Sequence, residues 1–113
     1  MKHYYSLEIS MLGENERSFE LDQEIGEALG FAEDDIDERE VYRMTAAFES
    51  DTMPSVMNVN VTQLLKRHPE IFYIDIIHRP IRRGYESLPD RTVIWGDGRI
   101  QNYVGRIIYE EVK

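Results

Sequence analysis

Apolar and polar residues alternate along HYYSLEISML, residues 3–12. Tyr5, Leu7, Ile9 and Met11 occupy every second position, and mostly polar side chains stand between them. Successive side chains of a strand point to opposite faces of a sheet, so this period predicts a strand with one buried face.

A short helix is predicted over QEIGEALG, residues 23–30, after a turn at 13–16. Asp22 is the expected N-cap, because its carboxylate accepts hydrogen bonds from free backbone N–H groups, and Gly30 is the expected stop. The preceding residues, 17–22, fit either a short second strand or a direct entry into the helix.

Residues 41–50, VYRMTAAFES, are ambiguous. Tyr42, Met44, Ala46 and Phe48 alternate without a break, which favours a strand followed by a turn. A helical spacing of the apolar residues also fits, so a helix is the alternative.

Apolar residues alternate with asparagines along SVMNVNV, residues 55–61, which predicts another short strand. Thr62 then caps a short helix, QLLKRH, which ends before Pro69. A continuous helix from Ser55 is the alternative, disfavoured by three valines and two asparagines of low helix propensity.

The most apolar stretch is IFYIDIIHR, residues 71–79, and it predicts a central strand. Residues 81–91, IRRGYESLPDR, are expected to form a loop. The segments TVIW and RIQNYVGRIIYEEV flank Gly-Asp-Gly at 96–98, which predicts a β-hairpin because tight turns need positive φ. Gly105 predicts a bulge in the last strand.

These elements predict a single α+β domain over residues 1–113, with a largely antiparallel sheet of four to six strands. Two short helices cover one face and a hairpin ends the chain; a ferredoxin-like arrangement with an added hairpin is the topology considered. A chain of 113 residues with 42% hydrophobic residues is long and apolar enough to bury one core.

The charge is unevenly distributed. Residues 1–51 carry 15 acidic and 4 basic side chains, giving −11, whereas residues 52–113 carry 7 acidic and 9 basic, giving +2. Such asymmetry bears on partners and association rates, not on fold. A net charge of −9 repels free nucleic acid at long range, so the bulk charge disfavours direct nucleic-acid binding.

The absence of cysteine excludes disulfides, thiolate metal sites and cysteine nucleophiles. No apolar run is long enough for a signal peptide or a membrane span, so a soluble cytoplasmic protein without membrane contact is expected.

The strongest candidate for an interaction surface is the acidic run FAEDDIDERE, residues 31–40. Read as a calcium loop from Asp35, it fails, because Arg39 replaces a ligand and Glu40 replaces the required glycine. The run is either a solvated connection or a surface that attracts a basic groove. The candidate partner-binding residues are Glu33, Asp34, Asp35, Asp37, Glu38 and Glu40.

A basic cluster over residues 78–86 is the second candidate. Its Arg79, Arg82, Arg83 and Tyr85 are suited to phosphates or to stacking on a base. Pairing of these arginines with the surplus carboxylates of the N-terminal half is the favoured interpretation.

No motif predicts catalysis, a cofactor or a metal site. In a regular strand Asp75 and His78 point to opposite faces, so they form no acid–base dyad. The glycines at 96–98 lack the spacing and the following helix that a phosphate loop requires.

The sequence therefore favours a small acidic intracellular binding protein that acts through its charged surface. An inhibitor, immunity or counter-defence protein that docks on a basic nucleic-acid-handling protein, such as a nuclease, fits this charge pattern. A structural component that forms a homo-oligomer is the first alternative, and an enzyme of unknown chemistry is the second.

Overall fold

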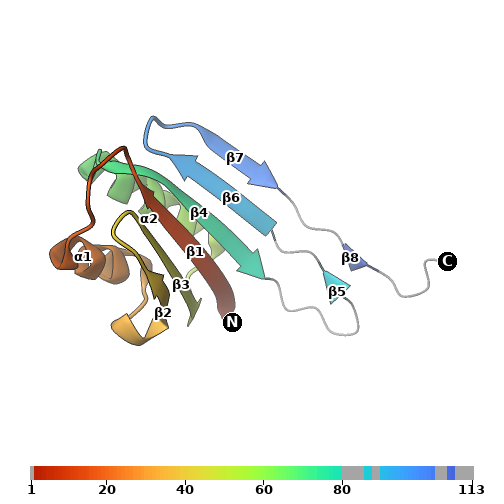
Figure 1. The fold of residues 1–113 in the computed structure, drawn as a ribbon. Coiled ribbons are helices and arrows are strands. Elements are labelled where there is room, and N and C mark those ends of the chain that lie inside the picture. The colour runs from red at the N-terminus through yellow and green to blue at the C-terminus, as the bar shows by residue number, and fades with distance from the viewer. Residues whose placement is uncertain (1, 80–85, 88–89, 104–106, 109–113) are drawn as a thin grey trace.

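The computed structural model describes residues 2–79, 86–87, 90–103 and 107–108. Its main sheet has six strands in the order β2-β3-β1-β4-β6-β7, and every neighbouring pair is antiparallel. Both helices cover one face of this sheet (Figure 1). The elements are β1 (His3–Met11), α1 (Phe19–Leu29), η1 (Glu33–Asp35, one 3₁₀ turn), β2 (Ile36–Arg39), β3 (Arg43–Ser50), α2 (Pro54–Arg67), β4 (Ile71–Arg79), β5 (Glu86–Ser87), β6 (Asp90–Trp95), β7 (Ile100–Tyr103) and β8 (Ile107–Ile108).

The predicted α+β architecture is confirmed. The element order β1-α1-β2-β3-α2-β4 combined with the strand order β2-β3-β1-β4 is that of a ferredoxin-like split βαβ unit. The β6–β7 hairpin extends the sheet beyond β4, and β5 pairs with β8 in a separate two-stranded sheet.

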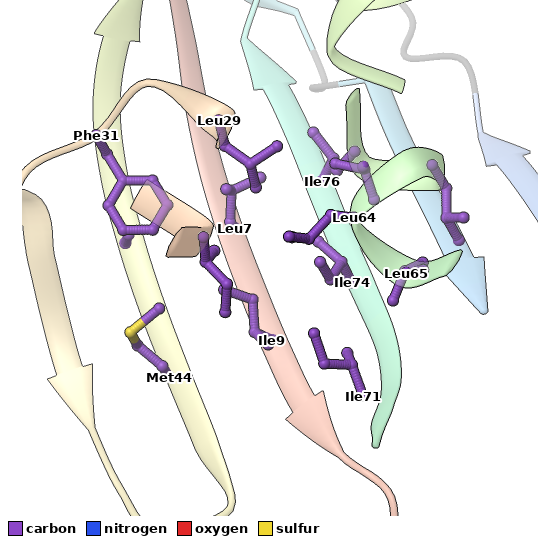
Figure 2. Packing of buried hydrophobic residues seen from close by; sticks show 14 of the residues in the cluster. Leu7, Ile9, Leu29, Phe31, Met44, Leu64, Leu65, Ile71, Ile74 and Ile76 are labelled. Atoms are coloured by element: carbon purple, nitrogen blue, oxygen red, sulfur yellow. The ribbon is translucent and has the colours of Figure 1, made fainter. Parts of the chain in front are cut away.

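The core lies between the helices and the sheet because strand register aligns the apolar alternations. Leu7 stands opposite Ala46 on β3 and Ile76 on β4, and Ile9 stands opposite Met44 and Ile74. Side chains from both helices close over these residues, as Figure 2 shows for Leu29 of α1 and Leu64 of α2. The strand predicted for residues 3–12 and its buried face are confirmed.

Helix α1 begins earlier than the sequence predicts. Ser18, not Asp22, is the N-cap, and its hydroxyl accepts a hydrogen bond from the N–H of Leu21 at 3.1 Å. The cap prediction for Asp22 is wrong because this carboxylate is buried and paired with Arg17. The stop at Gly30 is confirmed, and its φ of 94° is the left-handed conformation that glycine adopts most easily.

Helix α2 is continuous from Pro54 to Arg67, so the strand predicted over 55–61 is wrong. Met57, Val61 and Leu64 fall on one helical face and are completely buried. A valine costs at most about 0.7 kcal/mol of helix propensity, whereas burying an aliphatic side chain contributes about 1.5–3 kcal/mol. Burial therefore outweighs the local preference.

The strand predictions for 41–50 and 71–79 are confirmed as β3 and β4, with β1 and β4 in the middle of the sheet. The predicted hairpin is also confirmed, and its Gly98 has φ of 97°. The loop prediction for 81–91 is wrong in part, because β5 and the start of β6 fall within it. The bulge predicted at Gly105 lies outside the described residues.

Candidate functional site

The acidic run forms one edge of the sheet. Glu33, Asp34 and Asp35 make the η1 turn, and the next four residues form the edge strand β2, which the sequence analysis did not predict. We use the name acidic edge for Glu33, Asp34, Asp35, Asp37, Glu38 and Glu40. All are exposed except Asp35, which is half-buried and accepts a hydrogen bond from the N–H of Ala32 at 2.9 Å. Charged side chains on an edge strand also oppose pairing with a further strand.

Arginines of the N-terminal half form ion pairs with some of these carboxylates. Arg39 binds Glu33 through two nitrogens, at 2.5 and 3.1 Å, and its Nε lies 3.1 Å from Asp22. The hydrogen bond from Arg39 lowers the pKa of Glu33, so this carboxylate stays ionised to lower pH. Arg43 binds Glu8 at 3.1 Å and reaches Glu38 at 3.5 Å.

Other carboxylates around this edge have no hydrogen-bond or ion-pair partner within the described part of the chain. Two of them, Asp34 and Asp37, belong to the acidic edge. Four more come from the loop before α1 and from α1 itself, and are Glu14, Glu16, Glu20 and Glu27. Arginine contacts therefore leave this side of the molecule strongly negative.

A buried ion pair anchors the acidic edge to α1. Arg17 and Asp22 lie 2.5 Å apart, with side chains only 3% and 5% exposed, and Arg17 also donates to the carbonyl of Glu40. Beside this pair, the exposed side chains of Phe19 and Val41 line a hollow of about 260 Å³. The edge thus combines a rigid charged base with exposed apolar groups.

The basic cluster is only partly described. Arg79 is exposed at the end of β4 and forms no ion pair with another described residue. Arg82, Arg83 and Tyr85 lie outside the described residues. Those carboxylates of the N-terminal half that form ion pairs do so with other cations, so the favoured pairing is not seen for Arg79 among the described residues.

Asp75 and His78 point to opposite faces of β4, as the alternation predicts. Asp75 faces away from the helices, is 5% exposed, and is held by Arg91 through Nε at 2.9 Å and Nη2 at 2.6 Å. Arg91 in turn lies over the ring of Tyr103, with its guanidinium carbon 5.8 Å from the ring centroid.

His78 lies on the helix side, where its Nε2 is 3.0 Å from Nδ1 of His3. Burial, and then the neighbouring His3, lower the pKa of His78, which favours the neutral imidazole. Burial also raises the pKa of Tyr5 to about 12, and its hydroxyl donates to the carbonyl of Thr52 at 2.5 Å. Together with Asp90, His78 and Tyr5 line a hollow of about 220 Å³ below the start of α2.

Within the described ranges, no three His, Asp or Glu side chains come close enough together to hold one metal ion. None of the described helices has the length and apolar character needed to cross a membrane.

Comparison with protein-family models, with curated proteins and with solved structures found no match to this chain.

Sequence reasoning missed the paired polar groups that the fold brings together. Asp75 and Arg91 illustrate why, since they are diagonal neighbours only when the register places Asp75 opposite Val93. An acidic residue within an apolar strand, with an arginine just before a hairpin, is the signal that could have found them. The His3–His78 contact has no such local signal, because it depends on pairing of two strands distant in sequence.

Proposed function

We propose that this protein binds a basic protein through the acidic edge, and that its partner handles nucleic acid. The observation that carries the proposal is a set of exposed carboxylates, Asp34 and Asp37 among them, that have no partner among the described residues and lie beside a base fixed by the buried Arg17–Asp22 pair. Fixed negative charge attracts a groove built to hold phosphate and accelerates association.

Exposed apolar side chains next to this charge support a protein partner over a simple counter-ion. Phe19 and Val41 are 58% and 50% exposed beside the acidic edge. Protein interfaces commonly surround such apolar anchors with a charged rim. This combination suits an inhibitor, immunity or counter-defence protein of a nuclease, because such a protein competes with a nucleic acid for a basic groove.

The test begins with affinity capture from a lysate of the native host at low salt, followed by mass spectrometry and purification of the captured protein. Its affinity is then measured for the wild type and for the Asp34→Asn, Asp37→Asn double variant. Asp35 is left unchanged because it caps the η1 turn. A Ser55→Lys, Gln63→Lys double variant is the matched control, since it changes the net charge equally at exposed positions on α2.

We expect the double Asn variant to weaken binding roughly 2- to 30-fold, the range for two exposed charges, and to reduce its salt dependence. The control variant should bind as the wild type does. Equal effects of both variants would reduce the interaction to net charge and reject the acidic edge as the binding site.

A homo-oligomer is the second candidate function. Strand β7 is the far edge of the six-stranded sheet, and its Ile100 and Tyr103 are 51% and 52% exposed. An open edge of this kind can pair with a strand of another copy. Light scattering at low and high salt tests this, and a monomer at high protein concentration would reject it.

A further inference from the structure

No helix or strand of the described part of the chain covers the face of the main sheet opposite the helices (Figure 1). Register places Tyr73 of β4 opposite Trp95 of β6, and Arg91 of β6 opposite Tyr103 of β7, all on this face. Aromatic rings and an arginine thus lie in the solvent-facing layer of three neighbouring strands, which we call the open face of β4, β6 and β7.

Arg91 and Tyr103 form a pair whose geometry is held by the buried carboxylate of Asp75. The buried carboxylate of Asp75 holds Nε and Nη2 of Arg91, and the guanidinium lies over the Tyr103 ring. Both exposed partners remain about half accessible, at 51% for the Arg91 side chain and 52% for Tyr103. Among the described residues, Nη1 of Arg91 has no hydrogen-bond partner, so it is free to bind an anion.

A second aromatic group lies at the other end of these strands. The ring of Trp95 contacts those of Phe72 and Tyr73, at centroid distances of 5.2 and 5.1 Å, and Arg99 lies 4.8 Å over it. Phe72 is 40% exposed and, with Trp95 and Leu12, lines a hollow of about 310 Å³. Arginine-bearing ring clusters therefore stand at both ends of the open face.

The acidity of the chain does not extend to this face. Five strand spacings separate β2 from β7 in the sheet order, which is about 24 Å. The Debye length is about 8 Å at physiological ionic strength, so the acidic edge is screened from a ligand on β7. The cations at this face are Arg79, Arg91 and Arg99. The carboxylates at or beside it include Asp75, Asp97 and Glu8 of the neighbouring strand β1, and each of these three is paired with an arginine.

We propose that the open face of β4, β6 and β7 binds single-stranded nucleic acid. Bases stack on Tyr103 and on the Phe72–Trp95 group, and phosphates bind Arg79 and the free edge of Arg91. Stacking tolerates any base, since every base has a π-face, and arginines beside the rings add cation–π attraction. A duplex keeps its bases stacked inside, so it cannot use the rings. This site is independent of the acidic edge and of its protein partner.

The probe is single-stranded oligothymidine, titrated at about 50 mM and about 200 mM salt. Trp95 is the chain's single tryptophan, so quenching of its fluorescence reports directly on the open face. We expect saturable quenching that weakens with salt. Tyr103→Ala should weaken binding roughly 5- to 150-fold, as expected for loss of one stacked base. Tyr42→Ala is the matched control, a tyrosine of similar exposure, 48%, beside the acidic edge, and should leave affinity unchanged.

A second variant pair tests the phosphate contacts. Arg79→Ala should reduce the salt slope of binding by about one, whereas Arg67→Ala on the surface of α2 should not change it. Absence of quenching at low salt, equal losses from both tyrosine variants, or equally tight binding of a duplex or of polyphosphate would each overturn the proposal. The proposal would also be overturned if the wild type did not bind oligothymidine and Tyr103→Ala lost the captured protein partner, because the face would then be a protein-binding surface.

Discussion

Neutralising Asp22 is the sharpest test of how the acidic edge is held. Asp22→Asn keeps the shape of the side chain but removes the charge that Arg17 faces at 2.5 Å. The Arg17 side chain is only 3% exposed, so water cannot replace the lost partner. Breaking a buried pair by removing one charge costs about 3–5 kcal/mol. The second cation on Asp22, Arg39, is 37% exposed and adds little to this cost.

For a chain of 113 residues, 1 kcal/mol shifts the thermal midpoint by about 4 °C, so the expected fall is about 12–20 °C. Urea titration followed by circular dichroism measures the free energy directly. Asp51→Asn is the control, because it removes a carboxylate from an exposed pair with Lys2 and should leave the midpoint unchanged.

A double variant, Arg17→Met with Asp22→Leu, separates loss of the pair from loss of packing. Apolar residues of similar volume often replace a buried ion pair without net cost, so the double variant should be more stable than Asp22→Asn alone. A loss below about 1 kcal/mol for Asp22→Asn would show that water reaches Arg17. The description of a rigid base under the acidic edge would then be wrong.

Two histidines give opposite pH dependences, and one glycine reverses the usual helix preference. Burial lowers the pKa of His68, but its hydrogen bonds to Glu24 and Glu70 outweigh this effect, so the pKa is raised overall. The stability that protonated His68 contributes is present below about pH 6.5 and is lost as pH rises through the raised pKa. The lowered pKa of His78 means that stability is lost as pH falls below about 6.5, where the unfolded chain binds the proton more readily. Urea midpoints should therefore show His68→Gln losing stability relative to wild type as pH falls, and His78→Gln gaining it. Gly26→Ala should cost about 1–3 kcal/mol in urea unfolding, because the new Cβ would lie 2.7 Å from the carbonyl oxygen of Phe31; stabilisation, the usual effect of alanine in a helix, would contradict this packing.

The sequence predicted those elements in which the spacing of apolar residues matches the spacing of buried side chains. The alternation in β1 and β3 follows which side chains the sheet buries, so both were found. Part of helix α2 was predicted as a strand because Val59 looked like a buried residue alternating with Asn60. In the structure Val59 is exposed and Asn60 is half-buried, and the helical spacing is seen only in the residues that pack against the sheet. Strand β2 was missed because an edge strand of charged residues has no buried face to leave a pattern.

The candidate sites show the same division. Composition located the acidic edge, because exposed charge needs no partner to be recognised in a sequence. The open face of β4, β6 and β7 was not predicted, since its aromatic and arginine residues converge only through the pairing of β4 with β6 and β6 with β7. Arg91 and Tyr103 in particular stand twelve positions apart along the chain and become neighbours across a hairpin.

The charge imbalance between the two halves of the chain becomes an imbalance between the two edges of the sheet. Residues 1–51 form β2, β3, β1 and α1, and the later residues form β4, β6, β7 and α2, so the seam between β1 and β4 divides the charges. Among the described residues, ion pairs form within each half, except where Glu24 of α1 meets Arg67 and His68 of α2. Neither half therefore neutralises the other.

If both proposed sites bind, this separation would let one sheet serve two binding events at once. A basic protein on β2 and a nucleic-acid strand on β7 would lie about 24 Å apart, beyond the screening length, so neither would repel or displace the other through charge. Both proposed contacts should weaken with salt, but they would depend on different residues, Asp34 and Asp37 in one case and Tyr103 in the other. The acidic edge alone would suffice for a competitive inhibitor, whereas holding a partner and a strand together would use both proposed sites.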